Sequence, residues 1–310
     1  STIAMLTKRI LYLRGLGTAM VTPFTDDEMK SVDYDRLRLL IRRQIEGKAD
    51  FLVALGTSAE TPTLTEEEQD RVIRTFVEVN QDRLPLVVGV SSNSTLKVIT
   101  RLTTMDLTGI DAALVVCPFY NKPSQEGLYR HFRTIAEVSP IPIIIYNVPS
   151  RTGVNMLPET TIRLANDCPA IIGIKEASGI VGQIDLVRHR APEDFFVLSG
   201  DDTITYPLMT MGIDGVISVI GNAYPATFAE MVHLLAEGRD KEALHTHRLL
   251  KETFRLLFVD GNPSGAKALL SLMGLAPNVL RLPLVPVSEK TLAALKSEYS
   301  SVKGDPAFRD

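Results

Sequence analysis

The chain alternates eight times between a short apolar run and a longer amphipathic stretch. Continuous apolar runs are typical of strands buried on both faces of a parallel sheet, and the stretches between them have helical periodicity. Eight such units in succession predict a closed parallel barrel rather than an open sheet. The expected strands cover residues 17–21, 51–55, 86–90, 112–117, 143–146, 171–175, 195–199 and 216–220.

The strand-like runs end before residue 237, and the last part of the chain has only helical periodicity, over residues 240–259, 264–273 and 288–300. We therefore expect an α/β fold, a (β/α)8 TIM barrel over residues 1–236 with a C-terminal three-helix domain over residues 237–310. Helix starts are signalled by Thr65 and Glu68, which form a capping-box pattern, and by Pro158 and Pro225 at expected first turns.

Composition excludes several classes of protein. The formal net charge is −4, and no cluster of Lys and Arg resembles a nucleic-acid footprint. No run reaches the roughly 18 apolar residues of a membrane span, and the segment before Arg14 lacks an apolar leader with a cleavage site. Cys117 and Cys168 are too few for a disulfide scaffold, and His245 and His247 lack the spacing of a metal pair. We expect a cytoplasmic protein with no metal and with small-molecule or protein partners.

Lys175 ends the apolar run 171–175, where an amine can become a nucleophile. Lysine side chains are almost entirely protonated at neutral pH, so imine chemistry requires burial or a nearby cation. The apolar residues before Lys175 offer that burial. The alternative is a strand-end lysine whose amine reaches solvent. Lys267 is a second amine, which we expect on a C-terminal helix away from the barrel rim.

A barrel of this type places its chemistry at the carboxyl ends of its strands. Polar residues follow several of the expected strands at that end, and a lysine, two tyrosines, two hydroxyl residues and an arginine would share one rim. This convergence favours catalysis over a purely structural origin. The residues are Thr57, Ser58, Tyr120, Tyr146, Arg151 and Lys175, and Gly200 follows the seventh strand.

Five segments, taken in order and spacing, resemble the pyruvate-dependent class I aldolase family that includes N-acetylneuraminate lyase and dihydrodipicolinate synthase. The resemblance runs from about Gly17 to Leu282, and it implies a (β/α)8 barrel with a three-helix C-terminal domain, in agreement with the periodicity. The segments are Gly56-Thr-Ser-Ala-Glu60, Pro118-Phe-Tyr-Asn121, Tyr146-Asn-Val-Pro-Ser-Arg-Thr-Gly153, Gly173-Ile-Lys-Glu-Ala-Ser-Gly179 and Ser199-Gly-Asp-Asp202.

The resemblance implies that Lys175 attacks the ketone of pyruvate. The protonated imine then acts as an electron sink, so the methyl carbon loses a proton without a metal or bound cofactor. Thr57 and Ser58 would bind the pyruvate carboxylate through their hydroxyls and backbone N–H groups. The alternative for this pair is a simple turn or helix cap. Gly200 and Ile217 match positions whose backbones line the pyruvate pocket in the family.

The resemblance also implies a proton relay of Tyr146, Thr57 and Tyr120. In the family the residue at position 120 enters the neighbouring subunit's site across a tight dimer interface, so we expect a homo-oligomer, either a dimer or a tetramer of such dimers. Alternatives remain for both tyrosines. A strand-end tyrosine with a satisfied hydroxyl is common, and an interface role for Tyr120 needs only its ring.

Arg151 distinguishes members of the family. A guanidinium grips a carboxylate with two parallel hydrogen bonds, so it suggests a second substrate with an acid group. The segment 150–153 resembles the synthase branch, which condenses pyruvate with L-aspartate 4-semialdehyde to 4-hydroxy-tetrahydrodipicolinate in lysine and diaminopimelate biosynthesis. A solvated loop arginine is the structural alternative. There are two alternatives for the function. The chain could be another pyruvate aldolase that acts on a 2-keto-3-deoxy acid, or a catalytically silent paralogue that binds a keto acid.

Two departures from the family pattern fall in the carboxylate-binding segment. Ser58 replaces a usual threonine, and Ala59 replaces a usual glycine. Ala59 would be strained if the turn required a positive φ at that position.

Overall fold

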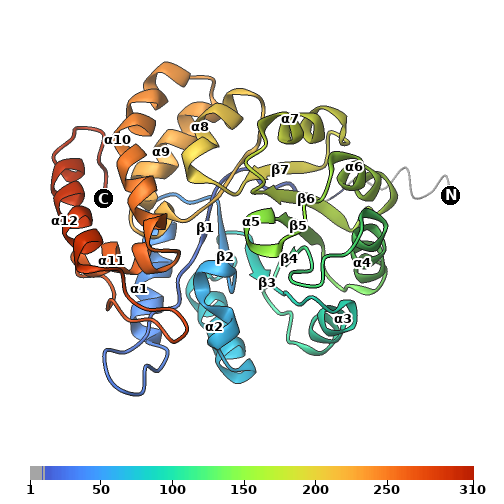
Figure 1. The fold of residues 1–310 in the computed structure, drawn as a ribbon, viewed down its shortest axis with the longest axis horizontal. Coiled ribbons are helices and arrows are strands. Elements are labelled where there is room, and N and C mark those ends of the chain that lie inside the picture. The colour runs from blue at the N-terminus through green and yellow to red at the C-terminus, as the bar shows by residue number, and fades with distance from the viewer. Residues whose placement is uncertain (1–8, 10) are drawn as a thin grey trace. The chain divides into compact units, whose positions relative to one another are not determined.

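The eight expected strands all form in the computed structural model, and they pair in chain order as a closed parallel barrel (Figure 1). The structure describes Arg9 and residues 11–310, so most of the segment before Arg14, in which no leader is expected, lies outside the described residues. The strands alternate with helices, and further helices follow the last strand. The predicted fold class is therefore confirmed.

Most strand boundaries differ from the expected ones by one residue, and two differ by more. The first strand begins at Gly15, two residues early, because the Asp50 N–H donates to the Leu16 oxygen at 2.7 Å and the Leu16 N–H donates to the Asp50 carboxylate at 2.8 Å. The eighth ends at Ser218, since residues 220–222 form a 3-10 turn. The strands are β1 (Gly15–Ala19), β2 (Phe51–Ala54), β3 (Leu86–Gly89), β4 (Ala112–Val116), β5 (Ile143–Asn147), β6 (Ile171–Glu176), β7 (Phe196–Ser199) and β8 (Gly215–Ser218).

The helices start where their capping residues predict. The Thr65 side chain accepts the Glu68 N–H at 3.1 Å, and the Glu68 carboxylate accepts the Thr65 N–H at 3.0 Å, which completes the capping box. Within the described part of the chain, no helix combines the length and apolar character needed to span a membrane. The helices are α1 (Tyr34–Glu46), α2 (Glu66–Asn80), α3 (Thr95–Thr104), α4 (Gln125–Val138), α5 (Pro149–Thr152), α6 (Pro158–Asp167), α7 (Val181–Arg190), α8 (Asp202–Thr210), α9 (Pro225–Ala236), α10 (Asp240–Val259), α11 (Ser264–Leu272) and α12 (Glu289–Lys303).

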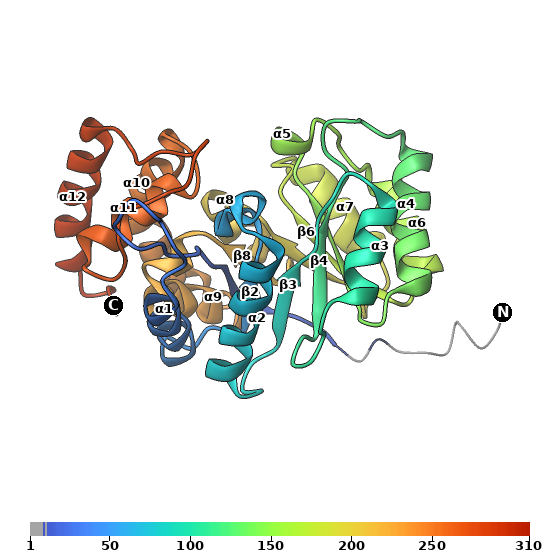
Figure 2. The ribbon, with the colours of Figure 1, turned by 90° about the horizontal axis from the view of Figure 1, so that it is seen from below.

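The chain forms two compact units, of which the first joins the described residues before Gly15 to Val87–Val216. In this unit α3, α4, α6 and α7 pack side by side in chain order, as Figure 1 shows, and Figure 2 shows the same four helices from below. Strands β4 to β7 consist mainly of buried Val, Ile, Leu and Ala side chains. The register of β5 and β6 places Tyr146 beside Lys175 and Asn147 beside Glu176.

The second unit joins Gly15–Leu86 to Ile217–Asp310. It contains β1 and β2, their following helices α1 and α2, and α9 to α12. Helix α10 packs against α9, and the three C-terminal helices α10, α11 and α12 pack against one another. The three helices confirm the expected elements, while the domain boundary at residue 236 stays a prediction.

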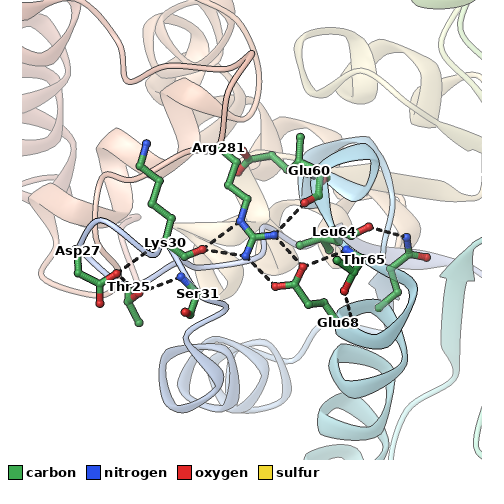
Figure 3. Close-up of polar contacts among 11 residues, drawn as sticks. Thr25, Asp27, Lys30, Ser31, Glu60, Leu64, Thr65, Glu68 and Arg281 are labelled. Atoms are coloured by element: carbon green, nitrogen blue, oxygen red, sulfur yellow. Dashed lines mark hydrogen bonds and ion pairs between the residues drawn. The ribbon is translucent and has the colours of Figure 1, made fainter.

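Arg281, in the segment between α11 and α12, ties together distant parts of the second unit (Figure 3). Its guanidinium donates to the backbone oxygen of Lys30 at 2.8 Å and to both carboxylate oxygens of Glu68 at 2.7 and 2.9 Å. Hydrogen bonding from Arg281 lowers the pKa of Glu68 to about 2. The pair therefore stays ionised over most of the acidic range.

Replacing Glu68 with Gln is expected to lower the free energy of unfolding at neutral pH by about 1–2 kcal/mol, because it removes a charge-assisted pair. The pKa of Glu68 is lower in the folded state than in the unfolded state, so its stabilising effect is present above the unfolded pKa and is lost as the pH falls toward about 2. The difference in the free energy of unfolding between wild type and variant should therefore shrink as the pH falls. Urea unfolding across this pH range measures it.

Glu67→Gln is the matched control, because Glu67 lies in the same first helical turn and is exposed. Equal effects of the two substitutions at neutral pH would contradict the role assigned to the Arg281 pair.

Candidate active site

Lys175 lies inside the protein next to a tyrosine ring. Only 5% of Lys175 is exposed, and the neighbouring strand places Tyr146 opposite it. The Lys175 Nζ lies 4.0 Å from the centroid of the Tyr146 ring. The alternative of a lysine that reaches into solvent is therefore excluded. A buried amine and a phenol hydroxyl are on adjacent strands, which suits nucleophilic attack with nearby proton transfer.

Gly200 leaves space beside this amine. It follows β7, and its N–H donates to the backbone oxygen of Glu176 at 2.9 Å. A Cβ at position 200 would lie 2.7 Å from the Cβ of Ala177 and 3.2 Å from the Cε of Lys175. Glycine therefore allows the close approach of the backbone at position 200 to Ala177 and Lys175.

Tyr120 and Arg151 lie on two loops joined by a backbone hydrogen bond. The Tyr120 N–H donates to the oxygen of Thr152 at 3.2 Å, next to Arg151 in the short helix α5. Tyr120 is 88% exposed and has φ +75°, a strained conformation for a bulky residue. Arg151 is exposed, and no described residue has a polar group bonded to its guanidinium. Both side chains are available to bind groups from outside this chain.

A buried polar network lies next to Lys175, and the sequence analysis missed it. The fully buried carboxylate of Glu176 accepts hydrogen bonds from Asn147 Nδ2 at 3.1 Å, Gln183 Nε2 at 3.2 Å and the N–H of Ser178 at 2.9 Å. Asn155 bonds Asn147 and Gln183, each at 2.9 Å. Burial raises the pKa of Glu176. The network fixes the chain on both sides of the lysine strand.

One signal in the sequence could have revealed this network. Asn147 and Glu176 are polar residues that directly follow two consecutive expected strands, at the same end of each. Buried polar residues require partners, so two of them at neighbouring strand ends indicate a shared network. The remaining members, Asn155 after α5 and Gln183 on α7, lie further along the chain, and no local pattern marks them.

The expected carboxylate-binding residues Thr57 and Ser58 begin a 3-10 turn directly after β2, in the second unit. Ser58 is buried, and its Oγ accepts a hydrogen bond from Asn262 Nδ2 at 3.0 Å. Ile217, in β8 of the same unit, is also buried. Lys175 and Tyr146 thus lie together in the first unit, and Thr57 and Ser58 belong to the second.

The condition under which Ala59 would be strained, a positive φ at that position, is not met. Ala59 lies inside the 3-10 turn, and the left-handed residues are instead its neighbours Leu55, at φ +57°, and Glu60, at φ +56°. An alanine in a right-handed turn meets no steric penalty. The turn therefore accommodates the departure from the family pattern.

Lys267 lies on the C-terminal helix α11 as expected, but the expectation that it lies away from the barrel rim is wrong. Its Nζ is 2.5 Å from Glu60 Oε2, and Glu60 ends the 3-10 turn that contains Ser58, in the loop after β2. Burial lowers the pKa of Lys267 to about 8, although the Glu60 carboxylate opposes the shift. The second amine thus contacts the segment that carries the hydroxyl pair.

No metal site emerges among the residues that the structure describes, since no three His, Cys, Asp or Glu side chains gather there. His245 instead contacts Asp305 at 2.9 Å. Both cysteines, Cys117 and Cys168, are free and buried.

Comparison with known proteins places these observations in a family. Residues 12–301 match the model of the Dihydrodipicolinate synthetase family. The chain is similar to 4-hydroxy-tetrahydrodipicolinate synthase of Phocaeicola vulgatus, with 52% identity over 291 residues that cover 94% of this chain and 97% of the relative.

Solved structures agree with this match. Dihydrodipicolinate synthase from Thermotoga maritima is similar at a TM-score of 0.91 and 41% identity, over 94% of this chain and 98% of the other. The Acinetobacter baumannii enzyme, solved with pyruvate, gives a TM-score of 0.90 and 36% identity over 94% and 99%. Because the family model and these relatives cover almost the whole chain, the chain belongs to the dihydrodipicolinate synthetase family.

Proposed function

We propose that this chain condenses pyruvate with L-aspartate 4-semialdehyde through a Schiff base on Lys175, giving 4-hydroxy-tetrahydrodipicolinate for lysine and diaminopimelate biosynthesis. The observation that carries the proposal is the buried Lys175 amine beside the Tyr146 ring, with glycine at position 200. Relatives named for this activity match the chain over nearly its whole length, which supports the same reaction here.

The reaction is proposed to begin with attack of the Lys175 amine on the ketone carbon of pyruvate. Loss of water gives a protonated imine, which draws electrons from the adjacent methyl carbon when a base removes its proton. The resulting enamine forms a carbon–carbon bond to the aldehyde. The amine of the second substrate then replaces Lys175 at the imine carbon, which closes the ring and frees the enzyme. Every covalent step uses a side chain or the substrates, so the proposal includes no cofactor.

Tyr146, with Thr57 and Tyr120, is proposed to carry protons to and from the intermediates. The contact between Lys175 and the Tyr146 ring supports this role. The Thr57 and Ser58 turn is proposed to bind the pyruvate carboxylate, with the backbones of Gly200 and Ile217 lining the pocket. The order of these segments along the chain supports the assignment.

Arg151 is proposed to bind the carboxylate of the second substrate. Its side chain is exposed, and no polar group of the described residues forms a hydrogen bond with its guanidinium. A planar guanidinium pairs well with a carboxylate, and a desolvated pair adds selectivity for an acidic aldehyde.

We also propose a cytoplasmic location and assembly as a homo-oligomer, as a dimer or a homotetramer. Two buried free thiols suit a reducing compartment. The strained and exposed Tyr120 supports a partner subunit, because a large aromatic side chain in a strained loop gains stability when a partner covers it.

Borohydride added with pyruvate is expected to label Lys175, because reduction converts the transient imine to a stable secondary amine. Peptide mass mapping locates the label. Lys175→Ala should remain folded, lose the label and lose most activity. A label on Lys267 instead, or active protein without any label, would refute the Schiff-base mechanism.

Arg151→Ala is expected to reduce use of the acidic aldehyde far more than imine formation with pyruvate. Loss of a charge-assisted carboxylate contact should cost about 1.5–3 kcal/mol of transition-state stabilisation. Steady-state kinetics with each substrate varied, together with pyruvate labelling, separate the two effects. Arg130→Ala is the control, since Arg130 is an exposed arginine on α4 paired with Glu126. Equal loss for both substrates would assign Arg151 a structural role.

Subunit mixing tests the role of Tyr120. Lys175→Ala and Tyr120→Phe proteins are each expected to be nearly inactive, and a mixture should regain activity because a mixed dimer contains one site with both groups intact. Native mass spectrometry monitors subunit exchange. If subunits exchange and activity stays absent, Tyr120 does not act across an interface.

A further inference from the structure

A buried ion pair holds the turn that carries Thr57 and Ser58. The Lys267 Nζ lies 2.5 Å from Glu60 Oε2, and both side chains are fully buried. Lys267 also donates to the backbone oxygen of Val279 at 2.9 Å, and the other Glu60 oxygen accepts the Arg281 N–H at 3.1 Å. Figure 3 shows Glu60 facing Arg281 at this position. Both charges are thus paired and hydrogen-bonded.

The backbone of Glu60 is strained, and its side chain accounts for the strain. Glu60 has φ +56°, a left-handed conformation that glycine adopts freely and glutamate does not. Such residues persist only where the surrounding structure holds them. Here the side chain is directed into the interior, where it meets Lys267. The ion pair therefore stabilises a turn geometry that the backbone alone disfavours.

This geometry extends directly to the hydroxyl pair. The Glu60 N–H donates to the Thr57 oxygen at 3.3 Å and closes the 3-10 turn. Asn262 donates to Ser58 Oγ at 3.0 Å. Asn262 and Lys267 lie just before and within the same helix, α11, so one C-terminal segment holds the turn at two points.

Stability alone does not explain this arrangement. Desolvation offsets most of the attraction within a buried ion pair, and well-packed apolar residues of similar volume often serve stability equally well. The pair also cannot act as a second nucleophile, because Lys267 is enclosed and donates to two acceptors. What the pair does provide is a defined position for the turn.

We infer that Lys267 is a positioning residue which, through Glu60, holds the Thr57 and Ser58 turn in the geometry that binds the carboxylate of a 2-keto acid. Helix α11 thereby controls capture of the first substrate. The inference rests on the proposed function, in which this turn binds pyruvate. It assigns to the C-terminal helices an effect on pyruvate that is separate from any effect on the aldehyde.

A double-mutant cycle tests the inference, with Lys267→Met, Glu60→Gln and the double variant. The readouts are the pyruvate concentration for half-maximal borohydride labelling of Lys175, and the KM for each substrate. Each single variant should raise the half-maximal pyruvate concentration about tenfold. The double variant should raise it no further than the more affected single variant does, because the effects of coupled residues are not additive. The KM for the aldehyde should change less than about twofold.

Lys30→Met is the matched control. Lys30 contacts the same C-terminal segment, through the backbone oxygen of Leu280 at 3.1 Å, but does not contact the turn, so its pyruvate dependence should equal that of wild type. Asn262→Ala is the second test, for use if the ion-pair variants fail to fold, because it acts on the turn without leaving a buried charge. It should raise the half-maximal pyruvate concentration severalfold. Circular dichroism establishes which variants fold.

Several results would overturn the inference. Folded Lys267→Met or Asn262→Ala protein with wild-type pyruvate dependence would do so, as would additive effects of the Glu60 and Lys267 substitutions or equal increases in both KM values. Wild-type protein that pyruvate and borohydride do not label would overturn the proposed function and this inference with it. Normal labelling of wild type with unchanged variants would overturn the inference alone.

Discussion

The parallel register of β5 and β6 is the constraint on which the site depends. It places Lys175 beside Tyr146, and one residue later it places Glu176 beside Asn147. Because successive side chains of a strand point to opposite faces, one pair brings an amine to an aromatic ring while the other enters a buried hydrogen-bond network. A shift of one residue would exchange these environments and remove the amine from the phenol.

Buried polar groups hold a loop in each of the two units. Glu176 receives three hydrogen bonds in the first unit, and Glu60 pairs with Lys267 in the second. Each carboxylate is buried, so displacement of its loop would leave a charge or its donors without partners, at high cost. Such restraint would suit the proposed site, because small errors in the position of reacting groups reduce rates strongly.

The sequence predicted features that depend on neighbouring residues. Apolar runs located all eight strands, and local signals located the capping box at Thr65 and the three C-terminal helices. Features that depend on distant residues were missed or mistaken. Lys267 meets Glu60 across 207 positions of the chain, and no local pattern indicates that contact. The left-handed Glu60 was likewise unpredictable, since propensity disfavours it and only its buried partner explains it. The roles of the site residues in catalysis stay predictions.

A crystal structure of the protein soaked in pyruvate tests the central claim most directly. We expect continuous density between Lys175 Nζ and the former ketone carbon, with the carboxylate of the adduct bound by Thr57 and Ser58. Saturating pyruvate that leaves Lys175 unmodified, or an adduct whose carboxylate lies away from the Thr57 and Ser58 turn, would contradict the proposed imine and the role of the turn that holds it.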